Sequence, residues 1–267
     1  MKNITRLFDI IDYTLKTYNN KVAIAGKNDD VWYAYSHQEY KKMADNLSYG
    51  LMESGIKPCD KIATITGNCP EWNIVDLAIL QIGAIHVPIY PNISDAEYDY
   101  ILNHAEVKMV FVAGMDMYER IKTILPNILS LKKIYTFKNI YGFEHFNELI
   151  KLGKQNPKQE ELQKIKESIG KNDLATLIYT SGTTGQPKGV MLSHNNLLSN
   201  AKAVISIPPN IHGWKILSFL PLCHVYERMM NYMFQIKGYS IYYVENPGRL
   251  SKCVGEIKPN IIYLLRL

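Results

Sequence analysis

The sequence predicts an α/β fold in which helices cover a mostly parallel, buried sheet. Segments with apolar residues at helical spacing alternate with short runs of strand-forming residues, as β-α-β units require. The 267 residues are 47% hydrophobic, enough for a sizeable core. No apolar stretch reaches the ~18 residues that span a bilayer. Asp9 and Asp12 interrupt the start, where a signal peptide is apolar, so we expect a cytoplasmic location.

Charge and cysteine content argue against two broad classes of function. The net charge is +5, from 30 basic and 25 acidic residues, and the basic ones are scattered rather than gathered in one tract. Nucleic-acid binding is therefore not expected. The four cysteines form no C-x-x-C pair. We expect small, reduced, buried side chains rather than a disulfide framework or a zinc site.

Helices and strands alternate through the first half of the chain. Ser36 with Glu39, and Ser94 with Glu97, are capping-box pairs that satisfy free backbone N–H groups where helices begin. Asn68 is the expected cap of a third helix. We expect helices over 4–18, 36–51, 68–82 and 94–102, and strands over 61–66, 84–89, 107–112 and 134–137.

A polar segment separates this half from the next. Residues 151–172 contain a proline and two glycines among charged side chains, which predicts a surface helix and a linker. We therefore place a boundary near residue 170, between subdomains 1–170 and 171–267. Beyond it we expect helices from 195 and after 221, and strands over 174–179, 190–193, 216–220, 241–244 and 258–264.

A loop rich in glycine and hydroxyl groups follows the strand expected at 174–179. Its glycines let backbone N–H groups approach a ligand, while hydroxyls and the Lys188 ammonium add donors, a set that suits phosphate oxygens. A solvated hairpin is the plainer interpretation, but eight of the ten residues from Thr180 to Gly189 are Gly, Ser, Thr or Lys. The loop is not a Walker A motif, because no Ser or Thr follows Lys188, and no G-x-G-x-x-G occurs.

The motif resembles a known family. YTSGTTGQPKGVMLSH (179–194) closely resembles the signature loop of the adenylate-forming (AMP-binding) enzymes, which include the acyl-CoA synthetases. NCPEWNIVDLAILQIGAIHVPIYPN (68–92) and IKPNIIYLL (257–265) are similar to other segments of that family. LPLCHVYERM (220–229) is similar to the LPLxHxxER segment of long-chain fatty acyl-CoA ligases and favours that subfamily. The resemblance implies a layered α/β/α/β/α fold with two mostly parallel sheets, here truncated.

The resemblance also implies a two-step ligase reaction. A fatty acid carboxylate attacks the α-phosphate of ATP, giving an acyl-adenylate and pyrophosphate, and coenzyme A then displaces AMP to form a thioester. Lys188 would neutralise the β/γ-phosphate charge, and the Thr180 hydroxyl would lie near Mg²⁺. The loop between them would supply further donors, from Ser181, Gly182, Thr183, Thr184 and Gly185. His224 would orient the attack; alternatively it caps the helix expected after Pro221.

Other residues have simpler interpretations. Glu227 and Arg228 are expected on a solvated helical face with one local ion pair. Trp72 is expected in the core, Pro88 in a turn, and His194 at the start of a helix. The aromatic and methionine residues near Glu227 either line an acyl tunnel or form plain core, and the core is favoured: Tyr226, Met229, Met230, Tyr232, Met233 and Phe234.

Three expected features of the family lie outside this sequence. They are a Y-G-x-T-E segment that holds adenine, a hinge Asp that binds ribose, and a C-terminal lid domain with a catalytic Lys. We therefore expect an N-terminal fragment of a long-chain fatty acid–CoA ligase, inactive alone. The alternatives are a non-catalytic nucleotide- or acyl-binding module and another carboxylate-adenylating ligase, while an unrelated phosphotransferase is disfavoured. A lipid substrate would allow peripheral membrane association, and the full-length protein could form a homodimer.

Overall fold

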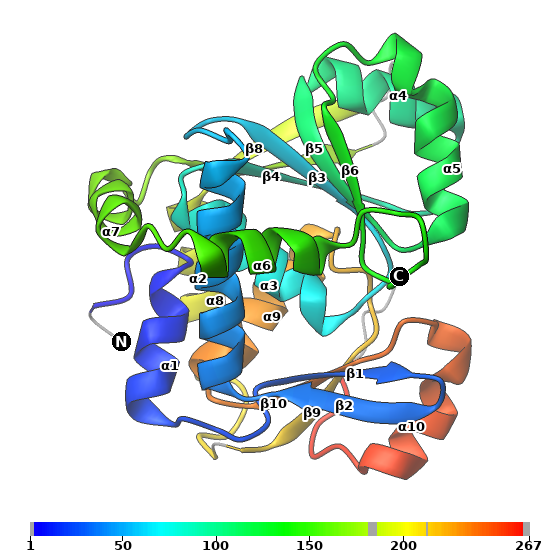
Figure 1. Cartoon of the computed structure of the whole chain (residues 1–267). Helices are drawn as coiled ribbons and strands as arrows, with labels where there is room; N and C mark the ends of the chain where they lie inside the picture. Colours follow the sequence, from blue (N-terminus) through cyan, green and yellow to red (C-terminus); the bar gives the residue numbers. More distant parts are fainter. Residues whose placement is uncertain (1–2, 181–185, 212, 264–267) are drawn as a thin grey trace.

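The computed structural model describes residues 3–180, 186–211 and 213–263, and shows two sheets with a layer of helices between them (Figure 1). The upper sheet has the strand order β6-β5-β3-β4-β7-β8, and the lower one β2-β1-β10-β9. Within these residues, β2 pairs antiparallel with β1 and β8 with β7, while all other neighbouring strands run parallel. The expected layered α/β fold with two mostly parallel sheets is therefore confirmed.

The strands of the upper sheet all fall where short runs of strand formers predicted them. They are β3 (Lys61–Ile65), β4 (Ile85–Ile89), β5 (Val107–Val112), β6 (Lys133–Thr136), β7 (Leu174–Thr180) and β8 (Lys188–Ser193). β4 is buried along its whole length, because helices cover both faces of the sheet.

The lower sheet includes a hairpin that was not predicted from the sequence. Its strands are β1 (Ile24–Asn28), β2 (Val31–Tyr35), β9 (Lys215–Ser218) and β10 (Ser240–Tyr243). Asp29 and Asp30 form the turn between β1 and β2 with φ of 46° and 65°. Two-residue hairpin turns of this kind usually have the sequence Asn-Gly or Asp-Gly. A pair of aspartates is a much weaker indication of a hairpin. At the other edge, Ile261 forms one parallel bridge to Ile216, where the last strand was expected.

Helices occupy three layers (Figure 1). α4 (Asp95–His104) and α5 (Met115–Ile124) cover the outer face of the upper sheet, and α10 (Leu250–Ile257) packs on the lower one. The middle layer contains α2 (His37–Glu53), α3 (Pro70–Gln81), α6 (Phe146–Gln155), α8 (His194–Ala203) and α9 (Val225–Ile236). α1 (Asp9–Thr17) and α7 (Gln159–Ser168) lie at one side, and two short 3₁₀ turns cover Leu125–Asn127 and Pro247–Arg249.

Two expectations at helix and strand boundaries were wrong. Both capping boxes are present, at Ser36 and Ser94, but Asn68 does not cap α3. Instead, Cys69 holds the cap position, because Pro70 fits the first helical residue and the residue before a proline is extended. Pro88 lies buried inside β4 rather than in a turn. Its missing N–H is tolerated because β7 is in register with β4 only at His86.

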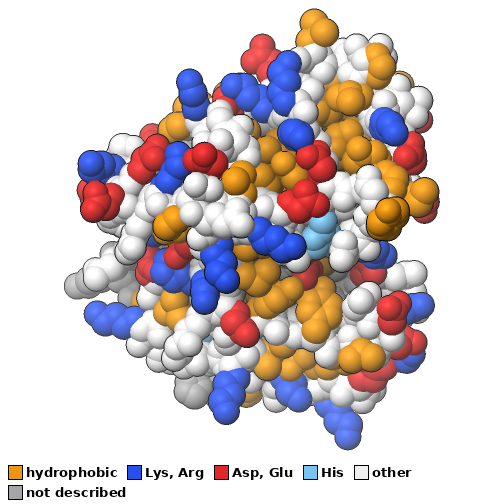
Figure 2. All heavy atoms as spheres, in the orientation of Figure 1, with side chains coloured by type: hydrophobic (Ala, Val, Ile, Leu, Met, Phe, Trp, Pro, Cys, Tyr) orange, Lys and Arg blue, Asp and Glu red, His pale blue; other side chains and the backbone are white. Residues whose placement is uncertain are grey.

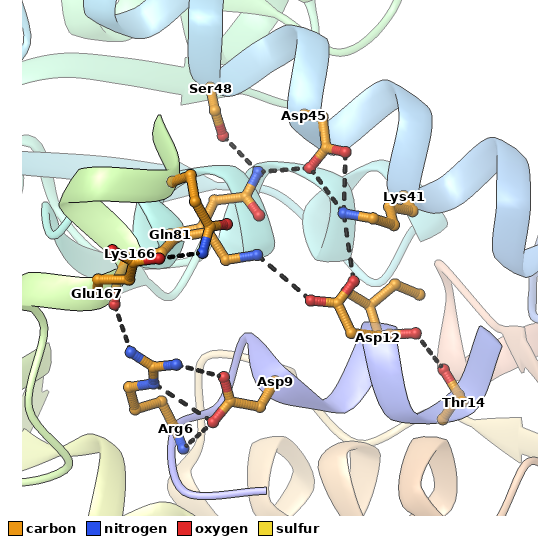
Figure 3. Close-up of polar contacts among 12 residues, drawn as sticks. Arg6, Asp9, Asp12, Thr14, Lys41, Asp45, Ser48, Gln81, Lys166 and Glu167 are labelled. Atoms are coloured by element: carbon orange, nitrogen blue, oxygen red, sulfur yellow. Dashed lines mark hydrogen bonds and ion pairs between the residues drawn. The ribbon is translucent and has the colours of Figure 1, made fainter. Parts of the chain in front are cut away.

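Polar contacts hold the N-terminal segment against α2 and α7 (Figure 3). Asp12 on α1 forms ion pairs with Lys41 of α2 and Lys166 of α7, each with an N–O distance of 3.3 Å. Lys41 also pairs with Asp45 at 2.9 Å. Arg6 pairs with Asp9 beside them, at 2.9 Å. These partly exposed pairs fix the orientation of α1 more than they add to stability.

Both sheets take strands from each side of residue 170, so the sheets do not divide at the subdomain boundary proposed above. The limits 1–170 and 171–267 stay a prediction. Acidic and basic side chains are interspersed over the face shown in Figure 2. Among the described residues, no helix is long and apolar enough to cross a membrane. The four cysteines are free thiols, and only Cys253 is fully buried as expected, because Cys69 and Cys223 are partly exposed and Cys59 is exposed.

Candidate functional site

Thr180 and Lys188 lie side by side at the carboxyl edge of the upper sheet. β7 runs parallel to β4, with His86 opposite Thr176, so both strands end at the same edge. Thr180 ends β7, Lys188 begins β8, and these two exposed residues are direct partners in the antiparallel register. Open α/β sheets bind ligands at this edge. The other loop candidates, residues 181–185, lie outside the described residues.

A glycine and two aromatic rings shape the base of this loop. Gly189 stands opposite Tyr179, and a Cβ atom on Gly189 would come within 3.2 Å of the Tyr179 ring. The Tyr179 hydroxyl lies 2.7 Å from Nδ1 of His104, which stacks on Tyr100. A larger residue at 189 would push the ring away from His104. Packing against the Tyr179 ring therefore favours glycine at position 189, where φ is not positive.

His224 stands at the start of α9 with its side chain exposed. It occupies the cap position, but its imidazole makes no capping hydrogen bond with the described residues, so it is not the helix cap that the plainer interpretation expected. Its ring lies 6.1 Å, centroid to centroid, from that of Tyr90, the residue after β4. Because β4 and β7 end together, His224 and Thr180 approach the same edge of the sheet.

Asn68 links the loop after β3 to the loop that leads into α9. Its side-chain amide donates to the carbonyl of Leu220 at 2.7 Å and accepts from the backbone N–H of Leu222 at 3.1 Å. These bonds use the side chain that was expected to cap α3. They hold the segment just before His224 against the end of β3, and so against the carboxyl edge of the upper sheet.

Arg228 is completely buried, and the expectation of a solvated face was wrong. Its guanidinium donates to Asp76 at 2.5 Å, to Thr176 at 2.6 Å and to the Tyr232 hydroxyl at 3.0 Å. His86 completes this Arg228 cluster, with Nδ1 2.7 Å from Asp76. Apart from Tyr232, these partners come from α3, β4 and β7, so the charge spacing along α9 could not reveal them.

The charges in the Arg228 cluster are matched internally. Burial by itself would raise the pKa of Asp76, but the charge of Arg228 and hydrogen bonds from His86 and Tyr232 hold it below its ordinary value. Burial lowers the pKa of His86 to about 4, so its ring is neutral. A neutral ring beside a carboxylate carries its proton on Nδ1, which leaves Nε2 to accept from Thr64 at 2.8 Å.

Glu227 is also buried, on the side of α9 that faces the lower sheet. One carboxyl oxygen accepts hydrogen bonds from Ser218 at 2.6 Å and from the Tyr263 hydroxyl. The other oxygen has no hydrogen-bond partner among the described residues. Burial raises the pKa of Glu227 to about 7. The predicted local ion pair with Arg228 was therefore wrong. Glu227 contacts the lower sheet, whereas Arg228 contacts the upper one.

The aromatic and methionine stripe of α9 belongs mainly to the core between the sheets. Tyr232, Met233 and Phe234 are buried, and Met229 and Met230 pack against the same cluster. Trp72 lies in the core as expected, with Arg228 5.3 Å above its ring. His194 begins α8 as expected, and its Nδ1 also accepts from the backbone N–H of Leu7 at 3.3 Å.

Comparison with known proteins places this geometry in a family. The AMP-binding enzyme family matches residues 11–265. A long-chain-fatty-acid–CoA ligase of Xenopus laevis is 29% identical over 95% of this chain and 36% of its own length. One from Homo sapiens is 31% identical over 90% of this chain and 37% of its own. The chain thus spans a little over a third of these relatives.

Solved structures agree at the level of the fold. An anthranilate CoA ligase superposes with a TM-score of 0.78, covering 95% of this chain and 48% of its own, at 20% identity. A long-chain-fatty-acid–CoA ligase from Archaeoglobus fulgidus gives 0.77, covering 95% of this chain and 50% of its own, at 21% identity. Because the family match covers nearly the whole sequence, the chain belongs to the AMP-binding enzymes.

Proposed function

We propose that this chain forms the ATP- and acyl-binding part of a long-chain fatty acid–CoA ligase. The observation that carries the proposal is the pairing of Thr180 with Lys188 across a hairpin at the carboxyl edge of a parallel sheet. Both side chains are exposed there, and the exposed ring of His224 approaches the same edge. The named relatives in this family that act on long-chain fatty acids support the choice of substrate.

Lys188 would act as a fixed positive charge for the triphosphate. It begins β8 directly opposite Thr180, so an ATP held across the hairpin places phosphate oxygens between an ammonium and a hydroxyl. Charge-assisted contacts of this kind are the stronger hydrogen bonds in proteins. They would hold ATP in place for attack by the carboxylate and stabilise the departing pyrophosphate. The His224 ring would donate to the same group of oxygens and orient the attack.

The residues at this edge fit a magnesium ion that arrives with its nucleotide. Within the described part of the chain, no group of three or more His, Cys, Asp and Glu side chains could hold a metal ion. Thr180 offers a single hydroxyl, and Mg²⁺ commonly keeps waters and substrate phosphates as its other ligands. When bound, the ion supplies charge neutralisation on the phosphates. Thr180 would then be its protein ligand, and Lys188 would neutralise the remaining phosphate charge.

We further propose that this chain alone binds ATP but does not activate a fatty acid. It spans a little over a third of its relatives, whose named activity belongs to the longer polypeptides. Coenzyme A would be the second substrate of such a longer protein. A cytoplasmic location, peripheral membrane association and homodimer formation are part of the same proposal.

An ATP–pyrophosphate exchange assay with palmitate, run beside calorimetric titration of ATP, tests both statements. We expect ATP binding by the purified chain and no exchange above the level without palmitate. A chain that does not bind ATP would overturn the proposed function. Robust palmitate-dependent exchange without a partner chain would show that the chain is competent alone and refute only the second statement.

A further inference from the structure

The Arg228 cluster connects three elements that each lead to the candidate site. Thr176 lies four residues before Thr180 on β7, and His86 lies four residues before Tyr90. Arg228 lies four residues after His224, and its backbone N–H donates to the His224 carbonyl at 3.1 Å. Thr176, His86 and Arg228 are thus each separated from an exposed residue at the edge by one helical turn or a short length of strand.

The contacts inside the cluster cross between those elements. The guanidinium of Arg228 reaches Thr176 of β7 at 2.6 Å, and the hydroxyl of Thr176 donates to the backbone carbonyl of His86 on β4, also at 2.6 Å. Asp76 of α3 accepts from Arg228 and lies beside the His86 ring. One buried side chain therefore fixes where α9 sits along β7 and β4. A planar donor fork with several fixed partners permits little sliding.

We propose that Arg228 is a positioning residue, which fixes the His224 ring relative to Thr180 and Lys188 by holding the first turn of α9 against β7 and β4. Arg228 would fix the position of the His224 ring whether or not a ligand is bound. Its consequence for catalysis rests on the proposed function, because small displacements of an orienting group are costly in enzymes. Replacing a buried ion pair with apolar groups is often neutral for stability, so the retained charge is better explained by register than by folding energy.

A second buried cluster on the same helix provides a matched control. Asn231 donates to Asn73 of α3 at 2.7 Å and accepts from Tyr243 of β10 at 2.6 Å. It is as buried as Arg228 and lies nearly one turn further along α9. Its partners belong to α3 and the lower sheet, and none of these bonds reaches β7 or β4. A substitution there perturbs the packing of α9 without releasing it from the strands that carry the site.

The test is an NMR measurement on the whole chain labelled with ¹³C at its histidines. His224→Gln identifies the His224 signal, and Tyr90→Leu shows where that signal moves when the neighbouring ring is lost. Thr176→Val removes the acceptor that β7 offers to Arg228, whereas Thr176→Ser keeps the hydroxyl. We expect the His224 signal to move toward its Tyr90→Leu position in Thr176→Val, and to stay in place in Thr176→Ser and in the control Asn231→Leu.

Three results would overturn the proposal. The His224 signal could stay in place in Thr176→Val, it could move equally in Asn231→Leu, or Thr176→Ser could fail to restore it. If Thr176→Val does not fold, Arg228→Lys gives the same reading, because its single ammonium cannot reach Asp76 and Thr176 as the fork does. ATP titration of the unchanged chain tests the proposed function separately, so failure of either is recognised on its own.

Discussion

The loop hairpin and the Arg228 cluster are neighbours on β7, but they are built in opposite ways. At the end of the strand, Thr180 and Lys188 are exposed and have polar groups to offer a ligand. Four residues earlier, Thr176 is buried and bonded on both sides. In our proposals, the first region would bind the ligand and the second would hold the first in position. The comparison predicts that substitutions in the buried cluster reduce stability, while substitutions in the loop reduce ligand binding.

The largest effect is expected from Arg228→Ala. Removing one partner of a buried ion pair leaves Asp76 charged and uncompensated, which costs about 3–5 kcal/mol of unfolding free energy. Urea unfolding followed by circular dichroism measures the change, with Lys164→Ala on the exposed face of α7 as the control. A loss as small as that of the control would mean that Asp76 is solvated in the native protein, and the contrast between the two regions would fail.

Only one side of this contrast could be read from the sequence. The alternation of helices and strands and the glycine- and hydroxyl-rich motif are local features of the sequence. The strands of the upper sheet and the ends of the loop could therefore be predicted. The partners of Arg228 outside α9 lie 52, 142 and 152 positions away, and helical spacing suggested a solvated face instead. Likewise, the hairpin of β1 and β2 carries no glycine in its turn, and Asn68 bonds to a distant loop rather than to its own helix.

The contribution of the buried residue Glu227 to stability depends on pH. Burial raises its pKa to about 7 in the folded protein, from 4.5. The folded state therefore holds its proton more tightly than the unfolded state. Its contribution to stability is fully present below pH ~4.5 and falls by about 3 kcal/mol as the pH rises to about 7.

Comparison of the wild type with Glu227→Gln isolates this contribution, because the variant has no titrating group at position 227. The buried histidines His37, His86 and His194 have pKa values lowered by burial to about 4, so they add stability as the pH rises, and this background is shared by both proteins. We expect the stability of the variant, relative to that of the wild type, to rise between pH 5 and 7.5 in urea unfolding. A constant difference across that range would show that Glu227 is solvated.

Exposed residues affect stability where they satisfy backbone groups, and Ser94 is an example. Its hydroxyl accepts from the backbone N–H of Glu97 at the start of α4. We expect Ser94→Ala to lower the unfolding free energy by about 1 kcal/mol, with no change in ATP affinity. Thermal unfolding and calorimetric titration measure the two quantities. Weaker ATP binding in this variant would show that the start of α4 contributes to the candidate site.

Lys188→Ala should have the smallest effect on stability. The side chain is exposed at the start of β8, and such substitutions usually change the unfolding free energy by less than about 0.5 kcal/mol. The same urea unfolding experiment measures it. A loss comparable to that of Arg228→Ala would assign Lys188 to the fold and remove it from the set of residues offered to a ligand.

Calorimetric titration of ATP into the chain, Lys188→Ala and Lys164→Ala tests the central claim most directly. Loss of a charge-assisted phosphate contact costs about 1.5–3 kcal/mol, so Kd should rise roughly 10- to 100-fold in Lys188→Ala. Lys164→Ala removes the same charge from an exposed helix and should bind ATP as the unchanged chain does. Equal affinities in all three proteins would contradict the placement of the triphosphate at the Thr180–Lys188 hairpin.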